Sequence, residues 1–224
     1  MTPPPTVLVV GASRGIGLEL VRQYALAGWR VHATTRTPHD PGQLGRLAGD
    51  VTVHELEVRN RAHLADLVAS LEGEAIDLLV HNAGVMGRGD GRGHRRDEVM
   101  AINAEAPIRV VEALLGRVAA SAQRKVVLVS SRTGARQGRR GSLGTYGDSK
   151  AALNDGFRAR AGAWASRGVV AIAVHPGWVR TDMGGPAASL SVEESVTGIR
   201  RLVAELDSSH HGRFFTWDGR EHPW

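Results

Sequence analysis

Tyr146 and Lys150 place a phenol and an ammonium group four residues apart, at the start of a segment with a helical pattern. Side chains at positions i and i+4 lie on one helix face, so these two groups can reach the same small volume. A phenol has an ordinary pKa of about 10, and a cation beside it lowers that pKa because it favours the phenolate. The pair predicts a proton donor assisted by a lysine, although the same spacing also occurs on amphipathic helices that have no such role.

A glycine turn near the N-terminus is the first element that could position a cofactor against this pair. Residues 6–10 form a short apolar, β-branched run typical of a buried parallel strand, and residues 18–27 follow with helical periodicity. Between them, residues 11–17 read Gly-Ala-Ser-Arg-Gly-Ile-Gly. Glycine lets the backbone approach a pyrophosphate closely, and a helix N-terminus offers free N–H groups and a positive dipole end. Strand, glycine turn and helix together predict dinucleotide binding.

Arginines near the expected cofactor site favour a phosphorylated dinucleotide. Many NAD-binding folds have an acidic residue near the end of the second strand, where it holds the ribose 2′-hydroxyl. Here the expected strand at residues 30–35 ends in Thr35 and is followed by Arg36. Arg36 and Arg14, in the glycine turn, could clamp a 2′-phosphate, because guanidinium groups match phosphate geometry. We therefore predict that NADP(H) is preferred over NAD(H). The alternative is that both are surface arginines of an arginine-rich chain.

The rest of the chain continues the alternation of strands and helices. Further strands are expected at residues 51–56, 76–81, 125–129, 169–174 and 213–216, and helices at 61–71, 97–120, 146–167 and 192–206. Asn103 and Pro107 fall inside one of these helices, and a break in its hydrogen bonding is expected there because proline has no N–H. Ser191 and Glu194 form a capping-box pattern ahead of the last helix.

This alternation predicts an α/β fold. We expect a single doubly wound domain over residues 1–224, with a seven-stranded parallel sheet and helices on both faces. The cofactor half should cover about residues 1–90, and the catalytic and substrate half about residues 91–224.

Composition and charge limit the classes of function. The chain has 224 residues, no cysteine and a net charge of +5, with arginines crowded between Arg88 and Arg96 and between Arg132 and Arg140. Nucleic-acid binding needs readout elements beside the basic groups, and aromatic residues are only 4% of this chain. We expect no nucleic-acid partner, no membrane segment and no metal site, since no apolar run could span a bilayer and no thiolate is present. The N-terminal residues do not resemble a secretory signal, so a cytoplasmic location is expected.

Taken in order, these motifs resemble the short-chain dehydrogenase/reductase family over essentially the whole chain. Gly11, Gly15 and Gly17 match its glycine turn, and Asn82, Ala83 and Gly84 match its cofactor-supporting motif. The catalytic set is matched by Asn103, Ser131, Tyr146 and Lys150. The segment at the nicotinamide is matched by Pro176, Gly177 and Thr181. Residues 14–21, 176–186 and 217–224 look most like the C-factor and sniffer-type carbonyl reductase group. The resemblance implies a Rossmann fold and an enzyme that uses a nicotinamide cofactor.

The resemblance also implies a wider set of cofactor contacts. Tyr146, Lys150 and the motif residues of the glycine turn, the 82–84 segment and the nicotinamide segment belong to this set. The further contacts are Ser13, Arg14, Ile16, Arg36, Glu57, Val58 and Val179. Three positions depart from the family pattern. Val10 replaces a threonine that helps to hold the glycine turn, His81 replaces an asparagine, and Glu57 replaces an aspartate that contacts the adenine.

The implied reaction is hydride transfer between a nicotinamide and the carbonyl carbon of a small-molecule carbonyl or alcohol substrate. Tyr146 would act as the general acid, and Lys150 would lower the phenol pKa and hold the ribose hydroxyls. The Ser131 hydroxyl would stabilise charge on the carbonyl oxygen. Asn103 would position a water that links Lys150 to solvent. Ser130 is the competitor for the role of Ser131.

The substrate side and the assembly are less specified. Residues 181–191 are short where larger family members carry a lid, so an open cleft for varied carbonyl compounds is expected. The loop arginines could steer an anionic substrate or could simply solubilise the loop; they are Arg132, Arg136, Arg139 and Arg140. A homodimer or homotetramer is expected, because family members use the helices around residues 103–118 and 146–164 as interfaces. The alternative function is a cofactor-sensing or signalling protein with little or no turnover.

Overall fold

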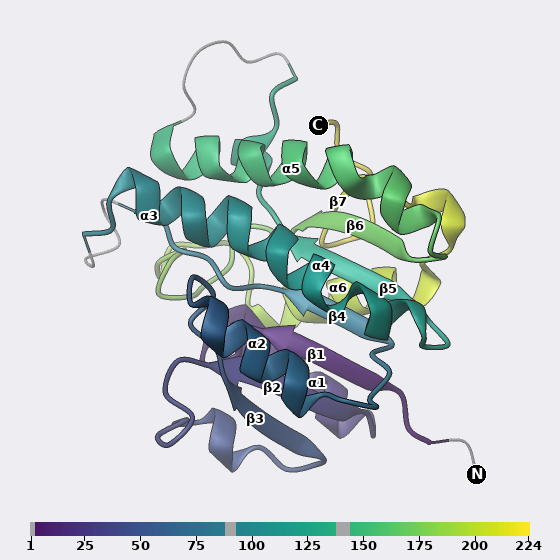
Figure 1. The fold of residues 1–224 in the computed structure, drawn as a ribbon. Coiled ribbons are helices and arrows are strands. Elements are labelled where there is room, and N and C mark those ends of the chain that lie inside the picture. Colours follow the sequence, from purple (N-terminus) through teal and green to yellow (C-terminus); the bar gives the residue numbers. More distant parts are fainter. Residues whose placement is uncertain (1–2, 88–92, 138–143) are drawn as a thin grey trace.

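One sheet of parallel strands forms the centre of the molecule (Figure 1). The computed structural model describes residues 3–87, 93–137 and 144–224. Within them the sheet has seven strands in the order β3-β2-β1-β4-β5-β6-β7, and every neighbouring pair is parallel. The strands are β1 Thr6–Val10, β2 Arg30–Thr35, β3 Val51–Glu55, β4 Leu78–His81, β5 Lys125–Val129, β6 Val170–His175 and β7 Phe214–Thr216. This confirms the predicted doubly wound sheet, and it puts the topological switch point between β1 and β4.

Helices cover both faces of the sheet (Figure 1). On one face lie α1 Gly15–Leu26 and α6 Val192–Glu205; on the other lie α2 Arg61–Ser70, α4 Ala106–Ala119 and α5 Gly144–Ala165. The short α3 Arg96–Met100 leads into α4, and 3₁₀ turns are η1 Leu44–Arg46, η3 Arg132–Gly134 and η4 Ser208–His210. The helices alternate with strands as the sequence pattern predicts.

Two apolar layers hold the helices to the sheet. Leu8 and Val10 of β1 belong to the layer under α2, α4 and α5, whereas Val7 and Val9 belong to the layer under α1 and α6. Successive side chains of a strand point to opposite faces, so a strand covered on both sides must be apolar throughout. Fully burying one such side chain contributes about 1.5–3 kcal/mol. The fully buried β1 therefore lies in the middle of the sheet and carries the glycine turn to the switch point.

The helix predicted at residues 97–120 is three segments, because the π-helical turn η2 Ala101–Glu105 separates α3 from α4. The Ala106 N–H donates to the Ala101 carbonyl, five residues back. Pro107 has no N–H, so the carbonyl of Asn103 has no α-helical donor at its i+4 position. The predicted break is confirmed, and it places the fully buried Asn103 at the change in helix geometry.

Element boundaries differ from the predicted ones by a few residues. β4 begins at Leu78 instead of residue 76, because the Ile76 N–H donates to the Arg117 carbonyl outside the sheet. α5 begins at Gly144, two residues before the predicted start. The predicted capping box is confirmed: the Glu194 N–H donates to the Ser191 Oγ at 3.1 Å, and the Ser191 N–H donates to the Glu194 Oε2 at 2.8 Å.

The tail after β7 returns to the sheet and to α5. The Trp224 ring stacks on Phe214 with ring centroids 5.4 Å apart, and it lies 6.0 Å from the ring of Phe157. The Gln137 N–H donates to the Trp224 carbonyl oxygen at 2.9 Å. The last residues of the chain therefore lie against the loop that follows Ser131.

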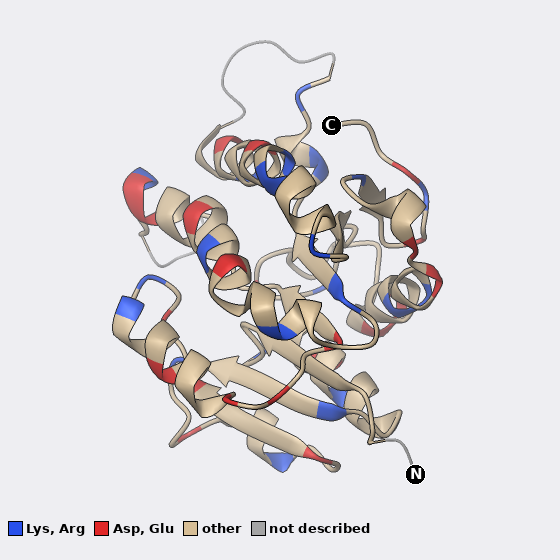
Figure 2. Cartoon of the chain, turned by 45° about the vertical axis from the view of Figure 1, so that its right-hand side comes forward, with Lys and Arg blue, Asp and Glu red and all other residues tan. Residues whose placement is uncertain are grey.

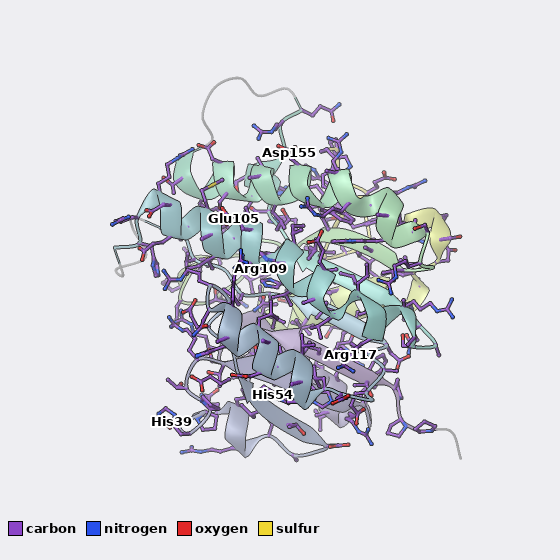
Figure 3. The ribbon with its side chains drawn as sticks, in the orientation of Figure 1. His39, His54, Glu105, Arg109, Arg117 and Asp155 are labelled. Carbon is purple, nitrogen blue, oxygen red and sulfur yellow. The ribbon has the colours of Figure 1, made fainter. Side chains whose placement is uncertain are left out.

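Charged residues of both signs lie side by side on the helical surface (Figure 2). Arg160 of α5 pairs with Glu112 of α4 at 2.5 Å. Arg109 and Arg117 instead reach from α4 to the carbonyls of Val58 and Val68 (Figure 3). Many arginines thus connect secondary-structure elements. Of the helices in the described part of the chain, none combines the length and the apolar character that a membrane span requires.

Candidate active site

A cleft of about 620 Å³ opens at the carboxyl ends of the strands. Ligands bind at this edge in open parallel α/β sheets, outside the topological switch point. Most of the sequence-predicted cofactor residues line the cleft: Gly11, Ser13, Arg14, Gly15, Ile16, Arg36, Glu57, Val58, Asn82, Ala83, Gly84, Tyr146, Lys150, Pro176 and Thr181. The fold therefore brings the glycine turn and the Tyr146–Lys150 pair to one cavity.

Some predicted site residues do not line the cleft. Among the described residues, these are Gly17, Gly177, Val179, Asn103 and Ser131. Gly177 has a φ of +90°, and a Cβ there would lie 2.2 Å from the Leu190 Cδ1. Val179 is buried and forms an isolated β-bridge with Leu190. Gly177 and Val179 shape the segment that closes the cleft but do not line it.

The glycine turn packs directly on the residues that follow β4. A Cβ on Gly11 would lie 2.6 Å from the Ala83 Cα, and a Cβ on Gly17 would lie 2.0 Å from the Gly11 carbonyl oxygen. The Asn82 Nδ2 donates to that same oxygen at 2.8 Å. Glycine is required at both positions because no side chain fits between the two segments.

A hydroxyl from the neighbouring strand holds the turn. The Gly11 N–H donates to the Thr34 Oγ1 of β2 at 3.1 Å. Val10 occupies the position where family members often have a hydroxyl, and Thr34 supplies one from the next strand. The sequence alone did not identify Thr34, because its role depends on the register that pairs β1 with β2.

Tyr146 and Lys150 line the cleft, and Ser131 lies next to the phenol without lining it. Tyr146 and Lys150 lie on the first turns of α5, and the Lys150 Nζ is 5.8 Å from the centroid of the Tyr146 ring. The Lys150 Nζ donates to the Val129 carbonyl oxygen at 2.9 Å, at the end of β5. The Ser131 hydroxyl lies close enough to the Tyr146 phenol to lower its pKa. Helical spacing and a strand end thus bring a phenol, a hydroxyl and an amine together.

The expected lowering of the phenol pKa is wrong in this structure. Burial raises the pKa of Tyr146 to about 12, and only the Ser131 side chain opposes this effect. Burial also lowers the pKa of Lys150 to about 8, because the charged ammonium is removed from water. The lysine is directed to a backbone carbonyl, so its charge does not offset the desolvation of the phenol.

The two adjacent serines have different partners. The Ser130 Oγ donates to the Asn154 Oδ1 at 2.6 Å, which holds β5 to α5. The Ser131 Oγ accepts the Thr133 N–H at 3.2 Å and the Thr133 hydroxyl at 2.9 Å. Because Ser131 acts on the pKa of the phenol while Ser130 is bonded to Asn154, this arrangement favours Ser131 as the catalytic serine.

Asn103 acts as a clamp beneath the cleft. Its Oδ1 accepts the Val85 N–H at 2.8 Å, and its Nδ2 donates to the Val85 carbonyl at 2.7 Å and to the Ser149 Oγ at 3.0 Å. A Cβ on Gly84 would lie 3.3 Å from the Asn103 Oδ1 and 3.5 Å from the Lys150 Nζ. The amide of Asn103 therefore fixes the segment after β4 against α5.

The arginine end of the cleft lies at β2 and the glycine turn. Arg14 forms an ion pair with Asp182, and both side chains are more than half exposed. The Arg36 guanidinium lies 4.0 Å from the Glu57 carboxylate. A Cβ on Gly15 would lie 3.1 Å from the Thr181 Cγ2, so the segment that carries Asp182 rests directly on the glycine turn. Asp182 lies in the stretch 176–186 that resembles the family, but the sequence assigned it no contact.

Several other cleft residues were also missed by sequence reasoning. They are Thr34, Thr35, Leu56, Arg59, Val85, His94, Ile102, Val129, Arg180, Asp182, Met183 and Val192. The general rule that ligands bind at the carboxyl ends of parallel strands could have identified the residues that end β2 and β5. His94 and Met183 lie in loops, where no periodic pattern marks the direction of a side chain.

The loop arginines do not behave as one group. Arg136 pairs with Asp155 at 2.9 Å on the outer side of α5 (Figure 3). Arg132 lines a separate cleft of about 350 Å³. Arg139 and Arg140, like Arg88 and Arg92, lie outside the described residues.

Comparison with known proteins agrees with this geometry. A family model described as short chain dehydrogenase matches residues 5–190. C-signal of Myxococcus xanthus is 40% identical over 154 residues, which cover 66% of this chain and 93% of that protein.

Solved structures of similar proteins extend over nearly the whole chain. An NADPH-bound carbonyl reductase from chicken fatty liver has 30% sequence identity and a TM-score of 0.86, and the match covers 100% of this chain and 96% of that one. A short-chain dehydrogenase/reductase from Burkholderia multivorans with bound NADP has 31% identity and a TM-score of 0.86, with coverage of 99% and 100%. The carbonyl reductase Sniffer of D. melanogaster has 26% identity and a TM-score of 0.86, with coverage of 99% and 100%. This chain belongs to the short-chain dehydrogenase/reductase family.

Proposed function

We propose that the protein is an NADP(H)-dependent oxidoreductase that interconverts a small carbonyl compound and the corresponding alcohol. The observation that carries this proposal is that Tyr146 and Lys150, with Ser131 beside the phenol, lie in the cleft that begins at the glycine turn. A proton donor, a hydroxyl and an amine at one end of a dinucleotide-sized cleft suit carbonyl reduction.

The residues present fit a phosphorylated dinucleotide. Gly11 and Gly17 let the turn pack directly on the segment after β4, and the N-terminus of α1 follows, so backbone N–H groups are available for a pyrophosphate. Arg14 and Arg36 line the same cleft and could bind a 2′-phosphate. The NADP- and NADPH-bound structures of similar proteins support this preference. When bound, the nicotinamide supplies the hydride.

The chain's own residues would handle the proton. The raised pKa of Tyr146 keeps the phenol protonated at neutral pH, so it can donate to the oxygen of a carbonyl that accepts a hydride. The Ser131 hydroxyl would stabilise the charge that develops on that oxygen. Lys150, once protonated, would favour the phenolate that remains and thereby assist the transfer.

Asn103 would contribute through its backbone. Both N–H bonds of its amide are already used by Val85 and Ser149. A water that links Lys150 to solvent would therefore use the Asn103 carbonyl, which Pro107 leaves without an α-helical donor. We propose this as the route by which solvent resupplies the proton that Tyr146 donates during reduction.

Assembly and location follow from the same proposal. We propose a homodimer or homotetramer formed through α4 and α5, in a cytoplasmic protein. Light scattering on the purified protein would measure the oligomeric state, and a monomer at micromolar concentration would contradict it.

Consumption of NADPH and NADH with a panel of aldehydes, ketones, dicarbonyls and quinones tests the function. Tyr146→Phe should lower turnover by about 10²–10⁴-fold, since one positioned proton donor contributes that much, while NADPH binding stays near normal. Equal turnover in the wild type and in the variant would contradict the role of Tyr146. NADPH binding without turnover on any carbonyl would favour the cofactor-sensing alternative.

A further inference from the structure

A second cleft lies next to Ser131, on the side of the loop that faces the C-terminal tail. Its volume is about 350 Å³, and its lining residues are Arg132, Thr133, Ala135, Gln137, His222 and Pro223. Arg132 directly follows Ser131, and consecutive Cα atoms are about 3.8 Å apart, so one wall of this cleft begins beside Ser131.

Two polar side chains of the cleft, those of Arg132 and Gln137, have no acceptor among the described residues. Arg132 makes no side-chain ion pair or hydrogen bond with any described residue, the carboxyl group of Trp224 included. The Gln137 side-chain amide likewise has no hydrogen-bond partner among the described residues. The His222 Nδ1 lies 2.6 Å from the Pro223 carbonyl oxygen, which orients the ring and leaves the Nε2 edge available. No carboxylate occurs among the described residues that line the cleft.

The tail holds this arrangement in place. The Gln137 N–H bonds to the Trp224 carbonyl oxygen, and the Phe214 and His222 rings are in contact with centroids 5.0 Å apart. Beside the cleft, the buried His175 has both ring nitrogens unpaired in the described structure. Burial lowers the pKa of His175 to about 4, and the nearby charge of Arg132 lowers it further.

We propose that this second cleft binds the carboxylate end of the substrate, so that the protein prefers aldehydes or ketones that carry a carboxylate. The proposal rests on the proposed function and names its substrate class. A guanidinium and a carboxylate match in a planar, bidentate geometry, and an unpaired Arg132 is free to adopt it. The Gln137 amide would supply a further donor, and the apolar surfaces of Ala135 and Pro223 would contact the body of the molecule.

Paired substrates that differ only in charge test the proposal. We would measure kcat/KM with NADPH for para-formylbenzoate and its methyl ester, and for the longer para-formylcinnamate and its methyl ester. The wild type should favour at least one acid over its ester. Arg132→Gln should lower that acid-to-ester ratio by about tenfold, the usual worth of one hydrogen bond to a charged group.

Arg136→Gln is the matched control. Arg136 lies in the same loop and loses the same charge, but it pairs with Asp155 and does not line the cleft. The acid-to-ester ratio should be unchanged in this variant. A ratio that falls equally in both variants, or that does not fall in Arg132→Gln, would overturn the proposal.

A direct binding measurement separates this proposal from the proposed function. If no carbonyl compound is reduced, the oxidoreductase assignment fails. Isothermal titration with terephthalate then still tests the cleft, with binding expected in the wild type and in Arg136→Gln and lost in Arg132→Gln. Absence of terephthalate binding to the wild type, together with equal rates for acids and esters, would refute the carboxylate site alone.

Discussion

The two ends of the main cleft hold their charged groups in opposite ways. At the proton-handling end, Lys150 is 3% exposed and its amine donates to a backbone carbonyl, and Asn103 is fully buried. At the arginine end, the side chains of Arg14 and Arg36 are 51% and 63% exposed, and their partners are carboxylates. One end is built into the core, whereas the other lies at the surface.

This difference has a physical consequence. A buried polar group that loses its partner costs about 1–3 kcal/mol, so the proton-handling end is held in one arrangement by the fold. An exposed ion pair contributes only about 0.2–1 kcal/mol, so Arg14 and Arg36 can leave their carboxylates for a ligand phosphate. The fold therefore fixes the proton-handling groups before a ligand binds. Recognition of the cofactor phosphate instead requires Arg14 and Arg36 to exchange their carboxylate partners for the phosphate.

The largest expected effect comes from the close backbone contact inside the glycine turn, between Gly17 and Gly11. In Gly17→Ala, the new Cβ would lie 2.0 Å from the Gly11 carbonyl oxygen and 2.7 Å from the Asn82 Nδ2. The turn must shift, and we expect NADPH binding to weaken by more than about a hundredfold, together with a lower melting temperature. Gly162→Ala on α5 is the control, because a Cβ at Gly162 would have no neighbouring atom within 4 Å. Near-normal NADPH affinity in Gly17→Ala would show that the turn is not the phosphate cradle.

Charge reversal at the arginine end should change cofactor selectivity. Arg36→Asp should weaken NADPH binding by about 10- to 100-fold and NADH binding much less, because only the 2′-phosphate loses a charge-assisted hydrogen bond. Fluorescence titration with both cofactors measures the ratio. Arg61→Asp makes the same charge change on α2, outside the cleft, and should leave the ratio unaltered. Equal weakening of both cofactors in Arg36→Asp would remove Arg36 from 2′-phosphate recognition.

The buried amine predicts the pH dependence of the proton-handling end. The pKa of Lys150 lies at about 8, below its ordinary value, so the ammonium is present below that pH and is lost above it. We expect kcat/KM for carbonyl reduction to fall about tenfold per pH unit above pH 8, because reduction uses the protonated form. A pH–rate profile of the wild type checks this. In Lys150→Arg the group no longer titrates, and a fall at the same pH would assign it to another residue.

The smallest expected effect is at the ion pair across the cleft mouth. Asp182→Asn frees Arg14 from its carboxylate, so NADPH affinity should rise by about two- to fivefold, the range that an exposed pair is worth. Asp155→Asn, which frees Arg136 instead, serves as the comparison. Weaker NADPH binding in Asp182→Asn would mean that Asp182 holds the segment closed on the ligand rather than competing for Arg14.

The sequence by itself determined the parts of this protein that depend on local spacing. The i, i+4 relation puts Tyr146 and Lys150 on one helix face wherever the helix lies. The apolar run of β1 and the glycines after it require a strand followed by a tight turn, and Pro107 breaks the helix that contains Asn103 in any tertiary setting. These features depend on covalent geometry and on periodicity, which the amino-acid order contains.

Only the tertiary structure decided how the groups behave. Burial, not the nearby lysine, governs the pKa of Tyr146, and desolvation depends on all the segments that cover the residue. Thr34 holds the glycine turn, Asp182 pairs with Arg14, and His222 joins Arg132 in the second cleft. Each of these contacts joins residues far apart in the chain, and their proximity follows from sheet register and from the path of the tail, which local patterns do not contain.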